Sequence, residues 1–282
     1  MESLQSTKNR IKLVSSIKKT THAMQMIAIA KMRRTKTIFN NINPYNQEMV
    51  STFEKIINKL DQIDFEKVFA LNTSKISLHI IITSDLGMAG TYNSNILKLA
   101  RSAIKKNDLV IVLGHKGINF FKEKKWESNL LEYFSFPSED IDYSIIREIT
   151  KKAMKMYNEN QIGKIKVIYT DFINNIVQKE TIKTIFPIEY TKNVSKDFET
   201  IEIEPSPYEV LTSAFPLYIS NYIYTCCIVS KLSENASRRM SMENATNNAS
   251  DIIDKLKLEL NRKRQSIITQ ELNEIISGAE AI

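Results

Sequence analysis

Glycine and proline are missing from two long stretches of this 282-residue chain, residues 1–43 and 217–277. Inside an α-helix, glycine costs about 1 kcal/mol and proline about 3 kcal/mol relative to alanine. We therefore predict one long helix at each end of the chain. At about 1.5 Å per residue the second helix would be on the order of 90 Å long, which is too long to be buried within one domain. It must pack against another long helix, and the N-terminal stretch is the only candidate.

Apolar and small residues recur at steps of three and four in both stretches, which is typical of two helices that contact each other along a seam. In the first stretch these residues are Ile17, Thr21, Met24, Ala28, Met32, Thr35, Phe39 and Ile42. In the last stretch they are Ala245, Ala249, Ile252, Leu256 and Leu260, followed by Ile267, Leu272, Ile275 and Ile276. Pro44 either ends the first helix or kinks it, and we expect the helix to continue to about residue 58.

The middle of the chain has a different pattern, in which short apolar runs alternate with helical stretches. We expect buried strands at Ile76–Ser84, Leu109–Leu113, Lys164–Thr170 and Ile182–Ile188, and helices near residues 93–105, 116–125 and 144–160. This alternation indicates an α/β domain with a largely parallel sheet. The expected fold is a pair of long helices, residues 1–60 and 207–282, with a Rossmann-like α/β domain inserted between them at residues 61–206.

The positive charge is concentrated at one end. Residues 1–40 contain nine lysines and arginines but one acidic residue, whereas the whole chain carries a net charge of +7. This permits a second hypothesis, a basic coiled coil that binds nucleic acid. However, the apolar residues from Met24 to Ala30 interrupt the charge where a DNA-contacting region should be solvated. We favour a packed helix face flanked by a solvated charged one.

The segment Ser84–Gly90 follows a predicted strand and precedes a predicted helix, where doubly wound folds bind phosphates. It permits a third hypothesis, a nucleotide-binding enzyme. The segment lacks the Lys-Ser/Thr pair of a P-loop and the third glycine of a dinucleotide fingerprint. We favour a tight turn with Asp85 as a helix cap. We find no catalytic constellation, no metal-ligand spacing and no sign of a cofactor.

Neither a secretory signal nor a membrane span is predicted, since the longest apolar region, Leu217–Val229, is about half of the ~20 residues that a span needs. Within the last helix Asn261–Gln265 interrupts the seam. Such a turn is usually solvated surface, but Arg264 could pair with a partner carboxylate. The tail Ile275–Ile282 is apolar, which fits either insertion into a partner or docking within the chain.

Three blocks together resemble the γ subunits of F-type ATP synthases, in the same order and over almost the whole length. The first is Leu4–Arg34, with Ala30-Lys31-Met32-Arg33. The second is Thr83–Gly90 with Tyr92–Asn95, and the third runs from Glu234 through Arg264-Gln265 to Ile282. The third block is the most specific. Because the first block begins near residue 4, we expect no transit peptide and a bacterial origin.

The resemblance implies a long antiparallel coiled coil that turns inside a hexamer of three α and three β subunits, one copy per complex. The inserted domain would be a foot resting, with the ε subunit, on the ring of c subunits, which provides the only membrane contact. Proton flow would turn the ring, and the chain would couple this rotation to ATP synthesis in the β subunits without catalysing it. The location implied is the cytoplasmic face of the bacterial plasma membrane.

The resemblance also implies site residues. Arg264 and Gln265 would form a catch on a β-subunit loop, and Met24 would lie near the moving β-subunit lever. The tail, with Ile275, Ile276 and Ile282, would turn in an apolar sleeve. Two positions depart from the family pattern: Leu86 replaces a usually basic residue, and Glu280 lies in a tail that is usually apolar.

Overall fold

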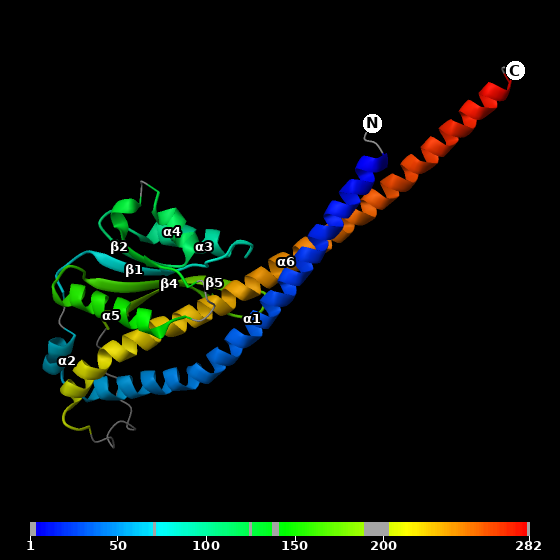
Figure 1. The fold of residues 1–282 in the computed structure, drawn as a ribbon. Coiled ribbons are helices and arrows are strands. Elements are labelled where there is room, and N and C mark those ends of the chain that lie inside the picture. The colour runs from blue at the N-terminus through cyan, green and yellow to red at the C-terminus, as the bar shows by residue number, and fades with distance from the viewer. Residues whose placement is uncertain (1–3, 70–71, 124–125, 137–140, 189–202, 281–282) are drawn as a thin grey trace. The chain divides into compact units, whose positions relative to one another are not determined.

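The computed structural model describes residues 4–69, 72–123, 126–136, 141–188 and 203–280 (Figure 1). The chain divides into two compact units. The larger is Lys31–Ser237, and the smaller combines Met1–Ala30 with Arg238–Ile282. The domain limits inferred from the sequence, at residues 60/61 and 206/207, were placed at the predicted ends of the long helices. They stay a prediction.

Two helices, α1 (Leu4–Lys59) and α6 (Pro207–Glu280), account for the stretches without glycine and proline. Helix α1 continues through Pro44, as predicted, and ends one residue beyond the expected position. Helix α6 likewise contains Pro216 near its start. In each case the proline and the residue four positions before it are exposed. Water can therefore replace the backbone hydrogen bond that proline cannot donate.

The described strands form one five-stranded sheet in the order β3-β2-β1-β4-β5. Strands β1 (Ser77–Ile82), β2 (Leu109–Leu113), β3 (Leu130–Phe134) and β4 (Lys164–Phe172) are parallel. Strand β5 (Gln178–Phe186) pairs antiparallel with β4 as a hairpin at the edge. The predicted fold class, long terminal helices with an inserted, largely parallel α/β domain, is confirmed.

The shorter helices are α2 (Gln62–Val68), α3 (Tyr92–Ala103), α4 (His115–Phe121), the 3₁₀ turn η1 (Glu127–Asn129) and α5 (Tyr143–Asn158). The sequence prediction missed α2 and β3. It also began β5 four residues late, because the first half of this edge strand is polar, and it extended α4 to residue 125, whereas the helix ends at Phe121. Residues 124–125 lie outside the described part.

Helices cover both faces of the sheet (Figure 1). Alternate residues of β1 point to opposite sides, as strand geometry requires. Leu78, Ile80 and Ile82 pack with α5, the end of α1 and the first half of α6. Ile81 packs with α3 and α4 on the other face. The adjacent Cys226 and Cys227 of α6 are free thiols buried in the first of these clusters.

The sheet contains one buried polar pair, His79 on β1 and Asp108 directly before β2. His79 Nε2 lies 3.0 Å from Asp108 Oδ2, and both side chains are almost fully buried. Asp108 also accepts hydrogen bonds from the backbone nitrogens of Ser77 and Lys105, each at 3.0 Å. Burial lowers the pKa of His79 below its usual 6.5, more than the nearby carboxylate raises it. His79 is therefore neutral at pH 7 and donates through Nε2.

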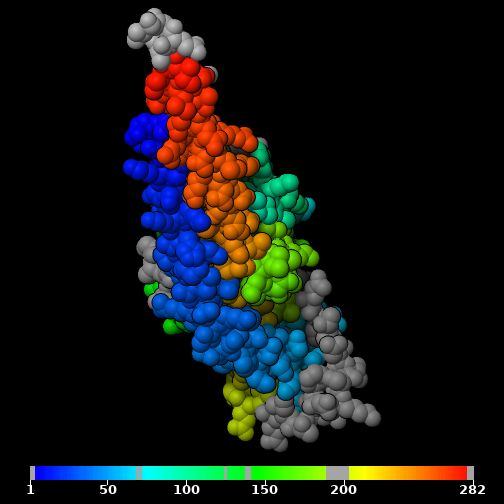
Figure 2. Space-filling model, turned by 90° about the vertical axis from the view of Figure 1, so that its right-hand side faces the viewer, coloured from blue at the N-terminus to red at the C-terminus, as the bar shows by residue number. Residues whose placement is uncertain are grey.

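In the smaller unit, the beginning of α1 and the end of α6 run antiparallel (Figures 1 and 2). The hydroxyl oxygens of Thr21 and Thr246 are 2.8 Å apart, and Lys263 Nζ donates to Thr7 Oγ1 at 3.1 Å. Thr7 and Ala28 are fully buried, and small side chains at these positions allow the helices to approach closely. On α6 the buried residues of this contact include Met242, Thr246, Ala249, Ile253 and Leu256.

Burial confirms the predicted seam up to Leu260 at all but two positions, and the four predicted positions beyond it, Ile267, Leu272, Ile275 and Ile276, are exposed. Ile17 is 47% exposed and Ile252 is 44% exposed. Lys18 is half-buried in place of Ile17, because the apolar stem of a lysine can cover a seam while its ammonium remains in water. Ile253 is buried in place of Ile252. An average spacing of 3.5 residues does not determine which of two adjacent residues faces the partner helix.

We expect the stability of the larger unit to fall as the pH is lowered from 7 to 5. The folded-state pKa of His79 is lowered, so below the unfolded pKa of about 6.5 the unfolded chain binds a proton that the folded chain excludes. The loss should be at most about 2 kcal/mol over this range. In His79→Gln, which keeps a donor near Nε2 but does not titrate, the loss should shrink.

Urea unfolding at pH 7 and pH 5 measures this difference, with His115→Gln at an exposed histidine as the control. An unchanged pH dependence in His79→Gln would contradict the assignment. Below about pH 4 a second loss is expected from Asp108. Burial alone would raise the pKa of Asp108, but its hydrogen bonds from Lys105, Ser77 and His79 together lower it.

We expect Leu256→Ala to weaken the helix pair locally by about 2 kcal/mol or more, since it removes a buried side chain from the contact. Ile276→Ala, at a 55% exposed position of the same helix, should change local stability by less than about 0.5 kcal/mol. Hydrogen exchange of the backbone between residues 242 and 263 is the measurement. Equal effects of the two substitutions would mean that the pairing does not end where the structure places it.

Candidate partner interface

Helix α6 continues beyond its contact with the described part of α1. Lys263 Nζ donates to Thr7 Oγ1 close to the start of α1, whose described part begins at Leu4. Every side chain described from residue 264 to residue 277 is exposed. In Figures 1 and 2 this end of α6, coloured red, extends past the blue beginning of α1. We call residues 264–277 the free end of α6.

The free end carries large apolar side chains in water. The exposed fractions are 41% for Ile267, 45% for Ile268, 53% for Leu272, 68% for Ile275 and 55% for Ile276. Ile268, Leu272, Ile275 and Ile276 are spaced to lie on one helix face. On another face Gln270 Nε2 donates to Glu274 Oε1 at 2.9 Å. An exposed apolar stripe on a helix of this kind marks a contact with another molecule.

The structure brings some of the predicted site residues together and separates others. Arg264 and Gln265 are exposed at the first turn of the free end, directly after Lys263. Ile275 and Ile276 lie on the same free end, about three helical turns further on. Met24 is half-buried, three residues from Thr21, and therefore lies beside the middle of the helix pair. Ile282 and the side chain of Glu280 lie outside the described residues.

The apolar patch between Met24 and Ala30 is less buried than predicted. Ala28 is fully buried, but Met26 is 46% exposed and Ile27 is 52% exposed. These two side chains therefore do not lie in the contact with α6. The nearby Lys12 and Lys19 are also exposed, so this part of α1 presents a basic surface with apolar residues in it.

The segment Ser84–Gly90 forms a turn, as favoured from the sequence, but Asp85 caps a different helix. Its Oδ1 accepts from the backbone nitrogen of His115 at 3.0 Å, at the start of α4, and from Ser135 Oγ at 2.7 Å. The first residue of α3 is Tyr92, and its N-cap Thr91 makes no side-chain cap bond. Met88 adopts a left-handed φ of 60°, and Leu86 and Met88 are exposed at the tip.

One polar cluster was not singled out from the sequence. In the larger unit the Tyr92 hydroxyl lies 2.7 Å from Ser230 Oγ, and that oxygen accepts from the backbone nitrogen of Thr170 at 3.3 Å. Ser237 Oγ donates to Ala89 O at 2.7 Å. Burial raises the pKa of Tyr92, so its hydroxyl remains a donor. These bonds hold the turn after β1 against α6. The only sequence signal was the polar run Ser230–Ser237, which directly follows the apolar segment Leu217–Val229.

The described residues contain neither a membrane-spanning helix nor a metal-binding cluster. No helix has an apolar stretch long enough to cross a membrane. No group of three or more histidine, cysteine, aspartate and glutamate side chains is arranged to hold a metal ion.

Comparison with known proteins identifies the family. The family model described as "ATP synthase" matches residues 3–282. The ATP synthase gamma chain of Mycoplasmopsis synoviae (strain 53) is 41% identical over 287 residues, covering 100% of this chain and 99% of the relative. That of Mycoplasmopsis pulmonis (strain UAB CTIP) is also 41% identical, covering 99% of both.

A solved structure has the same fold. It is the rotor of the Euglena gracilis mitochondrial ATP synthase in rotational state 1, with a TM-score of 0.67 at 15% sequence identity, covering 94% of this chain and 98% of that one. The relatives match the full length of the sequence, and the solved rotor shares its arrangement of long terminal helices and inserted sheet. The chain belongs to the ATP synthase gamma chain family.

Proposed function

We propose that this chain is the central rotor shaft of an F-type ATP synthase. In this role it couples proton-driven rotation of a ring of c subunits to conformational change, and so to ATP synthesis, in the β subunits. The observation that carries the proposal is the free end of α6, a continuous helix whose apolar residues have no partner within the described chain. Family membership and the likeness to a solved rotor support it.

The free end would turn inside an apolar sleeve formed by the hexamer of three α and three β subunits. An apolar contact suits rotation, because it is non-directional and does not need particular hydrogen bonds to break at each step. Ile275 and Ile276 are exposed as such a contact requires. We extend the same role to Ile282 from the sequence pattern.

Arg264 and Gln265 would form a catch on a β-subunit loop. Both are exposed where the pairing with α1 ends, so a partner can approach them from several sides. An arginine can hold a carboxylate through two parallel hydrogen bonds. Met24 would lie near the moving lever of a β subunit, next to the exposed Met26 and Ile27.

The inserted α/β domain would be the foot that rests on the c ring with the ε subunit. The chain would contact the membrane only through that ring, on the cytoplasmic face of a bacterial plasma membrane. The curated relatives named above are bacterial, which supports this location. We propose that the chain has no catalytic residue of its own and that ATP chemistry belongs to the β subunits.

The proposal is tested by measuring ATP hydrolysis with the purified chain and after co-expression with the α and β subunits of the same organism. We expect no hydrolysis by the chain alone and a co-purifying complex that hydrolyses ATP. Hydrolysis by the chain alone would favour an enzyme instead. A well-folded chain that fails to join the complex would overturn the shaft proposal.

We expect Arg264→Ala to lower the ATP turnover of the assembled complex by about tenfold, the value of a lost charge-assisted hydrogen bond. The free energy of unfolding of the chain should change by less than about 0.5 kcal/mol, since the side chain is exposed. Arg262→Ala, two residues earlier and also exposed, is the matched control. Equal ATP turnover in the two variants would contradict the proposed contact of Arg264 with a β-subunit loop.

A further inference from the structure

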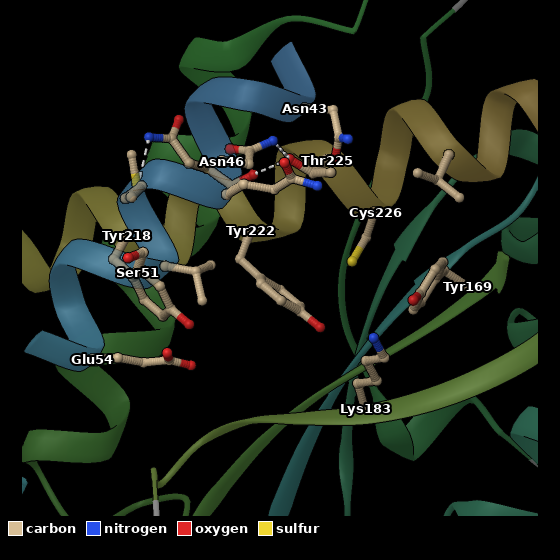
Figure 3. A pocket seen from close by; sticks show the side chains of 15 residues that line it. Asn43, Asn46, Ser51, Glu54, Tyr169, Lys183, Tyr218, Tyr222, Thr225 and Cys226 are labelled. Carbon is tan, nitrogen blue, oxygen red and sulfur yellow. Dashed lines mark hydrogen bonds between the residues drawn. The ribbon is translucent and has the colours of Figure 1, made fainter. Parts of the chain in front are cut away.

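The larger unit contains a cavity of about 390 Å³ between α1, α6 and the β4–β5 hairpin (Figure 3). This volume falls within the range of roughly 300–1,000 Å³ that is typical of small-molecule sites. The partner contacts proposed above use none of its residues. It is lined from α1 by residues 43–54, from α6 by residues 218–229, and from the sheet by Tyr169 and Lys183.

The walls of the cavity are mostly apolar. Met49 and Val50 of α1 and Val229 of α6 contribute aliphatic surface, and Tyr218 and Tyr222 contribute rings. Two polar side chains at the junction of the two helices are bonded to each other. Asn46 Nδ2 donates to Thr225 Oγ1, and Thr225 Oγ1 donates to the backbone oxygen of Asn221 at 2.8 Å.

Hydrogen-bond donors gather at the sheet side of the cavity. Tyr169 is only 4% exposed, and yet within the described chain its hydroxyl has no hydrogen-bond partner. The hydroxyl of Tyr222 also has no hydrogen-bond partner within the described chain. In Figure 3 the Lys183 side chain rises from β5 toward Tyr169 and Cys226, and Tyr222 reaches into the same space from α6. Burial raises the pKa of both tyrosines, so their hydroxyls remain protonated donors.

The charges around the cavity limit what it can hold. Among the described residues that line it, Lys183 is the only one with a cationic side chain. Burial raises the pKa of Cys226 to about 12, so the thiol is neutral. Burial raises the pKa of Tyr218, and the nearby Glu54 on α1 raises it further. Asp171 on β4 adds to the effect of burial in raising the pKa of Cys226. A ligand with one negative charge suits Lys183, whereas a second negative charge would meet these carboxylates.

We propose that this cavity binds a small monocarboxylate with an apolar body. The carboxylate accepts hydrogen bonds from Lys183 Nζ and from the hydroxyls of Tyr169 and Tyr222. The body packs on Met49, Val50 and the ring of Tyr218. Because the ligand contacts both α1 and β5, binding ties this part of α1 to the sheet. This assignment is independent of the rotor function.

Isothermal titration of the full chain with 4-phenylbutyrate, octanoate and 4-phenylbutan-1-ol tests the proposal. Both carboxylates share the proposed chemistry, and their relative affinities distinguish a flat aromatic body from a straight aliphatic one. We expect at least one carboxylate to bind, and the alcohol to bind at least about tenfold more weakly because it lacks the charge.

Substitutions of single residues distinguish the contribution of the lysine charge to carboxylate binding from the contribution of apolar packing. Lys183→Met should weaken carboxylate binding about tenfold, and Tyr169→Phe, which removes only a hydroxyl, several-fold. Lys179→Met changes an exposed lysine of the same strand outside the lining and should leave binding within about twofold. Far-UV circular dichroism confirms that each variant is folded. Absence of carboxylate binding to the folded wild-type chain, or equal loss in the two lysine variants, would overturn the proposal.

Discussion

The length of helix α6 is the constraint on which the rest of the structure depends. This one helix, from Pro207 to Glu280, has three segments that lie in different surroundings. Residues such as Leu211, Phe215, Ile219 and Ile223 complete the core beneath the sheet, residues 242–256 form the pair with α1, and residues 264–277 meet only solvent. A glycine or a further proline near the middle would interrupt this sequence of contacts, and between residues 217 and 277 the chain has neither.

The free end of α6 carries apolar side chains that the described part of the chain does not bury. A chain of this family has a use for such an end, because a shaft must be stiff and must contact its surroundings without locking to them. Polar side chains have other roles along α6. Ser230, Ser237 and Tyr92 fix the turn after β1 to α6, and Arg264 and Gln265 are placed where the free end begins.

Sequence reasoning predicted the elements with strong local signals and missed those that depend on tertiary contacts. The long helices followed from missing glycine and proline, and β1 and β2 from continuous apolar runs. Strand β3 was missed because Leu130–Phe134 is short, mixed in polarity and only partly buried. Asp85 was assigned to the wrong helix because its partner His115 is 30 residues away. The cavity could not be predicted, since its lining comes from α1, β4, β5 and α6.

The central claim is that the free end of α6 is a docking surface for the α and β subunits. Hydrogen exchange measured residue by residue, in the isolated chain and in the complex with three α and three β subunits, tests it most directly. We expect fast exchange at residues 264–277 in the isolated chain and slow exchange in the complex, with residues 242–256 protected in both. Exchange at residues 264–277 that does not slow on assembly would contradict it.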